Sequence, residues 1–172
     1  MNKFVAKLDY LIEKLLMLLM LAIVLIVTWQ VLSRYLLHAP SSVSEEAARF
    51  LLIWISLIGA VYCYRTKAHL GLDIITNKLA IKQQKIAAIF SHVMVFLFSA
   101  LVLVIGGIRL VALAFEPIQP SPALDVPMGY IYCVLPLSGL LLCLYATIAC
   151  LSEFSTISSA KDSPLKVNEE TK

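Results

Sequence analysis

Four long apolar runs, separated by polar segments, constrain this chain more than any other feature of its sequence. They cover residues 15–37, 47–64, 86–115 and 130–151. A bilayer crossing takes about 20 apolar residues, and helices satisfy their own backbone hydrogen bonds in lipid. With 60% hydrophobic and 15% charged residues among 172, the chain is too apolar for a soluble domain. The runs predict an all-α integral membrane protein with four transmembrane helices, a single membrane domain over residues 1–152 and a polar cytoplasmic tail over 153–172.

Two of the runs are expected to depart from a simple straight crossing. As one helix, the run 86–115 would measure about 45 Å, against a hydrocarbon core of about 30 Å. We therefore expect it to tilt, to break near Gly106 and Gly107 or to project into water. Pro136 lies close to the start of the last run and predicts a kink or irregular first turns there.

The lysines and arginines predict the orientation in the membrane. Eleven of the fourteen lie at the N-terminus, between the second and third runs or in the C-terminal tail, while Arg34, Arg49 and Arg109 fall on the other side. Basic residues accumulate on the cytoplasmic side of membrane proteins. Both termini are therefore predicted to be cytoplasmic. The net charge of +3 follows from this pattern and does not indicate nucleic-acid binding.

An acidic pair begins the second run. Ser42 and Glu45 have the Ser-x-x-Glu spacing of a helix N-terminus. Glu45 and Glu46 precede Arg49 by four and three residues, so one face of the helix can hold all three and neutralise the arginine. The alternative is that this charged cluster contacts another protein subunit at the entrance of the span.

The connection between the second and third runs has an amphipathic pattern. Apolar residues at offsets of three and four alternate with polar ones between Leu70 and Leu79. This pattern predicts a short helix along the cytoplasmic interface, with lysines that can anchor it to anionic lipids: Lys78, Lys82 and Lys85. The alternative is an ordinary loop whose apolar residues cover the end of the bundle.

The connection between the third and fourth runs packs four prolines into eleven residues, from Pro117 to Pro127. Prolines disfavour regular structure and predict a stiff, extended crossing. Such a segment, which also holds Asp125, is suited to dock a periplasmic protein. The alternative is a rigid connector without a partner.

The ionisable residues argue against several classes of function. The carboxylates around the last three spans lie at or beyond the span ends: Glu45, Glu46, Glu116, Asp125 and Glu153. The spans therefore lack the central acid that ion-coupled carriers use. The histidines lie at different predicted depths, which disfavours a haem pair, and the four cysteines form no CxxC pair. We expect no enzyme activity, metal or cofactor, and assign polar residues within spans, such as His92, to interhelical hydrogen bonds.

Small residues recur at helical spacing along two spans. One stripe consists of Gly139, Cys143, Ala146 and Cys150, and the other of Ser56, Gly59 and Cys63. Such stripes allow helices to approach closely in lipid. We therefore expect both to be packing surfaces.

The segment EEAARFLLIWISLIGAVYCYRTKAHLGLDII resembles a motif of the DctQ family, the small membrane subunit of tripartite ATP-independent periplasmic (TRAP) transporters. Its matching elements are Glu45, Glu46, Ala48, Arg49, Leu51, Leu52, Trp54, Gly59, Ala60, His69 and Asp73. A second similarity is the proline-rich connection followed by VPMGYIYCVLPLSG. Together, the resemblance covers about residues 5–152.

The resemblance implies a scaffold subunit, in the bacterial inner membrane, that lacks the transport site itself. A large TRAP membrane subunit would carry substrate and sodium and move as an elevator, while a periplasmic substrate-binding protein would deliver an organic acid. Family members import C4-dicarboxylates, sialic acid or other carboxylates, and overall similarity favours sialic acid. The competing hypothesis is a self-sufficient four-span protein, such as a small exporter or a lipid-facing adaptor.

Interface or folding roles, without catalysis, are expected for a small set of residues. They are Glu45, Glu46, Arg49, Trp54, Gly59, His69 and Asp73, with Asp125 for periplasmic docking and Lys78, Lys82 and Lys85 for contact with membrane lipids.

Overall fold

The computed structural model describes residues 3–36, 41–66 and 81–161. Its helices are α1 (Lys3–Leu36), α2 (Ser42–Arg65), α4 (Ile81–Phe98), the π-helical segment η1 (Ser99–Gly106), α5 (Gly107–Phe115), α6 (Met128–Tyr132) and α7 (Val134–Lys161). Within this part of the chain, four helical stretches are long and apolar enough to cross a membrane: Val5–Leu36, Ser42–Arg65, Ile86–Phe115 and Met128–Leu151. The predicted all-α fold with four membrane-spanning helices is confirmed.

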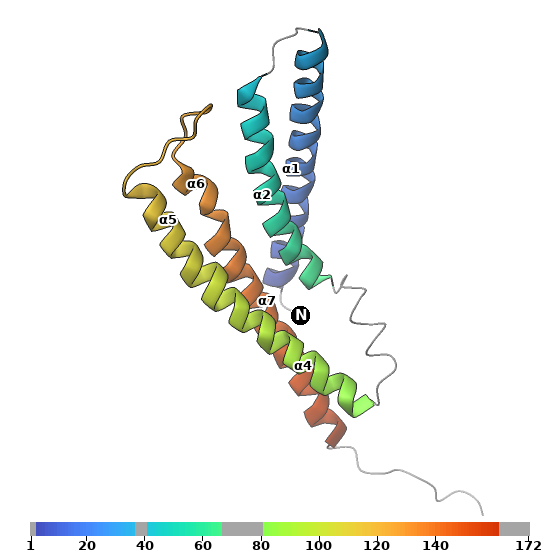
Figure 1. The fold of residues 1–172 in the computed structure, drawn as a ribbon. Coiled ribbons are helices and arrows are strands. Elements are labelled where there is room, and N and C mark those ends of the chain that lie inside the picture. The colour runs from blue at the N-terminus through green and yellow to red at the C-terminus, as the bar shows by residue number, and fades with distance from the viewer. Residues whose placement is uncertain (1–2, 37–40, 67–80, 162–172) are drawn as a thin grey trace, which may run out of the picture.

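The helices form two hairpins that diverge from each other (Figure 1). One hairpin consists of α1 and α2, and the other pairs the α4–η1–α5 helix with α6 and α7. The hairpins lie together near the end of α2, which we call the terminal end because α1 also begins there. They separate towards the loop end, where residues 116–127 join α5 to α6 (Figure 1).

A small core joins the hairpins through α2 and α7. Ile58 and Val61 of α2 are fully buried in one cluster with Val134 and Leu142, and α1 adds Leu19. Outside this core, most large apolar side chains along the spans are exposed. Apolar exposure of this extent suits helices that face lipid, because lipid tails are as apolar as the side chains.

The third span does not break at its glycines, so this alternative of the sequence analysis is wrong. The helix continues through Gly106 and Gly107, with a π-helical stretch immediately before Gly107. Gly107 instead allows close packing, since a Cβ there would lie 2.9 Å from Cδ of Pro136. A Cβ on Gly139 would likewise lie 2.7 Å from Cβ of Leu103. The glycines therefore bring spans three and four together.

Two span boundaries differ from the predicted ones, while the predicted irregular start of the last span is present. Cys133 separates α6 from α7, and Pro136, which has no N–H to donate, lies in the first turn of α7. Helix α7 continues through residues 153–161, so the first part of the predicted polar tail is helical. Helix α1 begins at Lys3, well before the apolar run at residue 15.

Residues 116–127 form a short hydrogen-bonded hairpin, not the extended crossing that the prolines predicted. Pro120 and Pro127 form an antiparallel bridge. The amide of Met128 donates to the carbonyl of Gln119 (2.9 Å), and that of Ser121 donates to the carbonyl of Val126 (3.0 Å). The prolines are compatible with this hairpin because its paired amides belong to other residues. We call residues 116–127 the loop hairpin.

Candidate functional site

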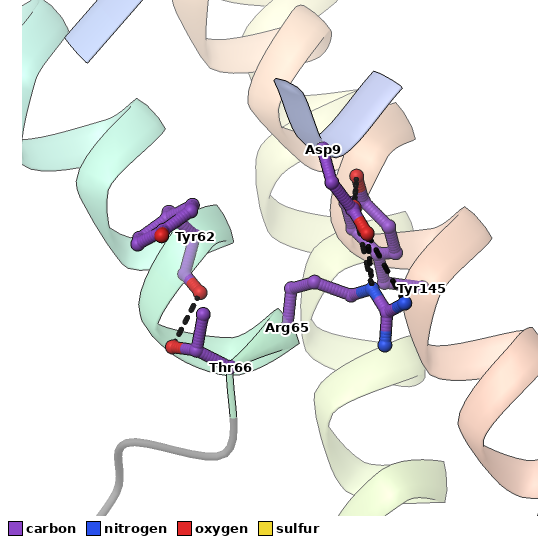
Figure 2. A network of polar contacts seen from close by, with 5 residues as sticks. All are labelled: Asp9, Tyr62, Arg65, Thr66 and Tyr145. Carbon is purple, nitrogen blue, oxygen red and sulfur yellow. Dashed lines mark hydrogen bonds and ion pairs between the residues drawn. The ribbon is translucent and has the colours of Figure 1, made fainter. Parts of the chain in front are cut away.

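Three side chains from three helices meet at the terminal end (Figure 2). Nη2 of Arg65 lies 3.1 Å from Oδ2 of Asp9, and Nε of Arg65 donates to the same oxygen over 3.1 Å. The hydroxyl of Tyr145 donates to Oδ1 of Asp9 over 2.7 Å. The guanidinium also lies 5.6 Å from the centre of the Tyr145 ring. We call Asp9, Arg65 and Tyr145 the clasp, because they link α1, α2 and α7.

The end of α2 positions the clasp arginine. Thr66 caps this helix, and its hydroxyl donates to the carbonyl of Tyr62 over 3.0 Å (Figure 2). A cation at a helix C-terminus is also favoured by the helix dipole. The side chains of Arg65 and Asp9 are 27% and 29% exposed, so this ion pair is partly buried.

A second polar contact lies beside the clasp and reaches the remaining span. The hydroxyl of Tyr64 and Nδ1 of His92 are 2.7 Å apart, with the two rings edge to face. The predicted interhelical hydrogen bond of His92 is therefore present, between α2 and α4. Together with the clasp, it ties all four spans near one end of the molecule.

At the loop end, Glu46 makes a different tie from the one predicted. Its Oε2 accepts hydrogen bonds from the backbone amides of Ala123 (2.8 Å) and Leu124 (3.0 Å) in the loop hairpin. Glu46 is only 8% exposed, which is low for a carboxylate, and charge-assisted bonds compensate for its burial. The carboxylate thus links the start of α2 to the second hairpin.

The predicted local pairing is present for Glu45 only. Nη2 of Arg49 lies 3.3 Å from Oε1 of Glu45, and the two side chains are 66% and 62% exposed. Among the described contacts, Glu46 bonds the loop hairpin and forms no direct ion pair with Arg49, so the predicted direct pairing is present for Glu45 alone. The cap of α2 is also one residue earlier than predicted, because Oγ of Ser41 accepts the bond from the amide of Ser44.

The other predicted site residues do not converge on one place. Trp54 packs against the core, while a Cβ on Gly59 would meet no described atom within 4 Å beyond the neighbouring backbone of its own helix. Asp125 is exposed in the loop hairpin. His69, Asp73, Lys78 and the predicted interfacial helix lie outside the described residues, and of Lys82 and Lys85 the structure describes only the place in α4.

The two small-residue stripes differ in their surroundings. In span four, the hydroxyl of Ser99 donates to the carbonyl of Gly139 (3.3 Å) and lies 3.0 Å from Sγ of Cys143. This stripe therefore packs against η1, as predicted. In span two, Gly59 faces open space and Ser56 is exposed, so these two members of the stripe are not packed against another helix within the described part of the chain.

Sequence reasoning missed the clasp. Asp9 and Arg65 are 56 residues apart, and Asp9 and Tyr145 are 136 apart, so no local spacing connects them. The available signal was weak: Asp9 is one of two acids within the basic N-terminal flank, beside Glu13, and Arg65 ends an apolar run. Chemically, the polar contacts hold helices at fixed positions. Among the described residues, no group of three or more His, Cys, Asp or Glu side chains is placed to bind a metal.

Four apolar spans tied by polar contacts near their ends define a multi-pass helical membrane protein. Comparison with known families narrows this class, because residues 23–156 match the model of the DctQ component of tripartite ATP-independent periplasmic transporters. The chain belongs to this family. It is therefore a transporter component and not an enzyme, and the family places it in the bacterial inner membrane.

Several relatives are similar to part of this chain. The chain is 36% identical over 125 residues to the isethionate TRAP transporter permease protein DctMQ of Oleidesulfovibrio alaskensis, covering 69% of this chain and 20% of that protein. It is 26% identical to the C4-dicarboxylate small permease protein DctQ of Rhodobacter capsulatus (58% of this chain, 44% of the relative). It is 30% identical to the sialic acid small permease protein SiaQ of Vibrio cholerae (51% of each). The matched regions thus span a fifth to about half of these relatives.

Proposed function

We propose that the chain is the small scaffold subunit of a sodium-coupled TRAP importer. It works with a large elevator-type membrane subunit and a periplasmic substrate-binding protein to take up an organic acid. The observation that carries this proposal, beside family membership, is that polar ties at both ends hold the two hairpins together. A moving elevator needs a stationary frame, and helices that are tied at both ends suit that role.

The orientation follows from charge. The terminal end lies beside the basic N-terminal flank and the basic segment after α2, so it faces the cytoplasm and both termini are cytoplasmic. The loop end, with the loop hairpin and the Glu45–Arg49 pair, then faces the periplasm.

The exposed face of α2 is the proposed contact with the large subunit. Arg49, Leu52, Ser56 and Gly59 follow one another at offsets of three and four, and the side chains of the first three are exposed. Gly59 leaves space for another helix to approach. The outward face of α1 is different, because it carries large residues such as Leu11, Leu18 and Leu25 that suit lipid.

The substrate class is an organic anion, and the names of the relatives supply the candidates: sialic acid, a C4-dicarboxylate or isethionate. The test is uptake of each labelled compound by cells that carry or lack this chain. We expect uptake of one of them to require both this chain and a sodium gradient. Uptake that continues unchanged without the chain would contradict the proposal, and uptake that persists in sodium-free medium would remove the sodium coupling.

The lysines after α2 are proposed to fix the depth of the scaffold by contacting anionic lipid headgroups. Replacing Lys78, Lys82 and Lys85 by glutamate should lower the amount of inserted protein or the transport rate, because each lysine near an anionic surface contributes about 1 kcal/mol. The measurement is membrane abundance together with uptake, and replacement by arginine is the matched control. Normal abundance and normal uptake in the glutamate variant would reject the anchoring role.

A further inference from the structure

We infer that the loop hairpin is a preformed docking surface for a basic patch on the periplasmic substrate-binding protein, and that Glu46 positions it. This inference rests on the proposed function, which supplies the partner and places the loop end in the periplasm.

The loop hairpin is ordered by its own hydrogen bonds. Besides the two ladder bonds already described, the amide of Asp125 donates to the carbonyl of Ser121 over 3.0 Å, and that of Gln119 to the carbonyl of Ala114 over 3.3 Å. Its prolines restrict the backbone further. A surface that is already ordered loses less conformational entropy when a partner binds.

Glu46 holds this hairpin from α2. Its carboxylate binds two consecutive amides near the tip, Ala123 and Leu124, and so joins the loop to the other helical hairpin. Figure 1 shows the loop extending from α5 and α6 towards the start of α2. Without Glu46, nothing else described in the structure bonds these two amides, and the tip loses its charged anchor. Glu46 is thus a positioning residue that is itself buried beneath the surface.

The exposed side of the loop hairpin is acidic with an apolar part. Glu116 and Asp125 are exposed, and neither forms an ion pair within the described residues. Ile118 and Val126 are exposed by 66% and 37%. The sequence has no lysine or arginine between Arg109 and Lys161, so no cation of this loop neutralises the acids.

The acidic and apolar composition of the loop hairpin indicates what kind of partner binds it. Apolar side chains with charged residues around them are the usual composition of a transient protein interface. Two unpaired acids complement a basic protein surface, which speeds association and fixes orientation. Anionic lipid headgroups would be repelled by the same acids, so the hairpin is directed towards a soluble protein and not towards the membrane.

The test removes the two charges with little change of shape. Asp125 has a φ of 54°, a conformation that asparagine also tolerates, so Asp125→Asn combined with Glu116→Gln keeps the hairpin. The complete transporter is reconstituted in proteoliposomes, and uptake is measured while the substrate-binding protein is titrated. We expect the half-saturating concentration of that protein to rise about three- to tenfold. The maximal rate and the bound large subunit should stay unchanged.

Each result decides the inference. An unchanged half-saturating concentration would overturn it, and so would loss of the large subunit from the complex, because the hairpin would then belong to that interface. Arg34→Gln alters an exposed charge at the end of α1 and is the control; an equal rise there would also overturn the specific role of the hairpin. Failure of the unmutated complex to transport with any binding-protein concentration would instead refute the proposed function.

Glu46 is tested in the same assay. Glu46→Ala should raise the half-saturating concentration about as much as the double variant, although Glu46 does not face the partner. Glu46→Gln should restore most of the affinity, because the amide oxygen can accept the same two hydrogen bonds. No change in the alanine variant, or no rescue by glutamine relative to alanine, would overturn the positioning role.

Discussion

Replacing Gly139 by leucine is expected to separate spans three and four. A Cβ at this position would lie 2.7 Å from Cβ of Leu103 and 2.9 Å from Cγ2 of Val104, and a complete leucine side chain has no space there. Overpacking of this kind costs about 1–3 kcal/mol. The separation also breaks the hydrogen bond from Ser99 to the Gly139 carbonyl. Thermal unfolding of the purified chain in lipid nanodiscs measures the loss of stability.

Gly59→Leu is the matched control, because both substitutions add the same side chain to a glycine within a span. At Gly59, no described atom beyond the neighbouring backbone of its own helix lies within 4 Å of the added Cβ, so the stability of the isolated chain should not change. Assembly with the large subunit should weaken, because the leucine side chain fills the space that Gly59 leaves for an approaching helix. Unchanged stability of Gly139→Leu would show that Gly139 does not bring spans three and four together. A Gly59→Leu variant that destabilises the isolated chain and spares assembly would show that Gly59 does not face the large subunit.

The second large effect is expected at the clasp. Asp9→Ala leaves Arg65 without its carboxylate and removes the acceptor of the Tyr145 hydroxyl. Breaking a fully buried ion pair costs about 3–5 kcal/mol, but these side chains are 29% and 27% exposed, which reduces the expected loss to about 1–2 kcal/mol. Tyr145→Phe removes one hydrogen bond and should cost less, about 0.5–1.5 kcal/mol. Thermal unfolding in nanodiscs compares the two variants.

A charge exchange provides the control for the clasp. Asp9→Arg combined with Arg65→Asp keeps an ion pair between α1 and α2, although the bond from Tyr145 is changed. We expect the double variant to be more stable than either single reversal. If the three variants are equally destabilised, side-chain packing rather than charge pairing holds the terminal end together.

The spans could be predicted from sequence because the length and hydropathy of a run are local properties. The Glu45–Arg49 pair was also predictable, since a separation of four residues on a helix fixes the distance. Glu46 precedes Arg49 by three residues and could also pair with it, yet it binds amides that are 77 and 78 residues away. Which partner Glu46 binds depends on where the loop hairpin lies in the folded chain, and the spacing of nearby residues does not predict that position.

The glycines illustrate a second limit of sequence reasoning. A pair of glycines within an apolar run is compatible with a helix break and with close packing, because both uses depend on the missing side chain. At Gly107 the glycine serves close packing, because Pro136 lies against it. This contact joins two spans and cannot be predicted from local sequence. The prolines of the loop hairpin show the same limit. They allow the hairpin because its hydrogen-bonded amides belong to other residues, and the sequence alone does not show which amides are paired.

Co-purification tests the central claim, that this chain is the fixed small subunit of a TRAP importer, most directly. The chain is coexpressed with the large TRAP membrane subunit of the same organism, and the complex is isolated from membranes through a tag on the large subunit. We expect the chain to elute with the large subunit in equal amounts, and Gly59→Leu to reduce this yield. If the large subunit elutes alone and organic-acid uptake survives deletion of this chain, the chain is not the small subunit of such an importer.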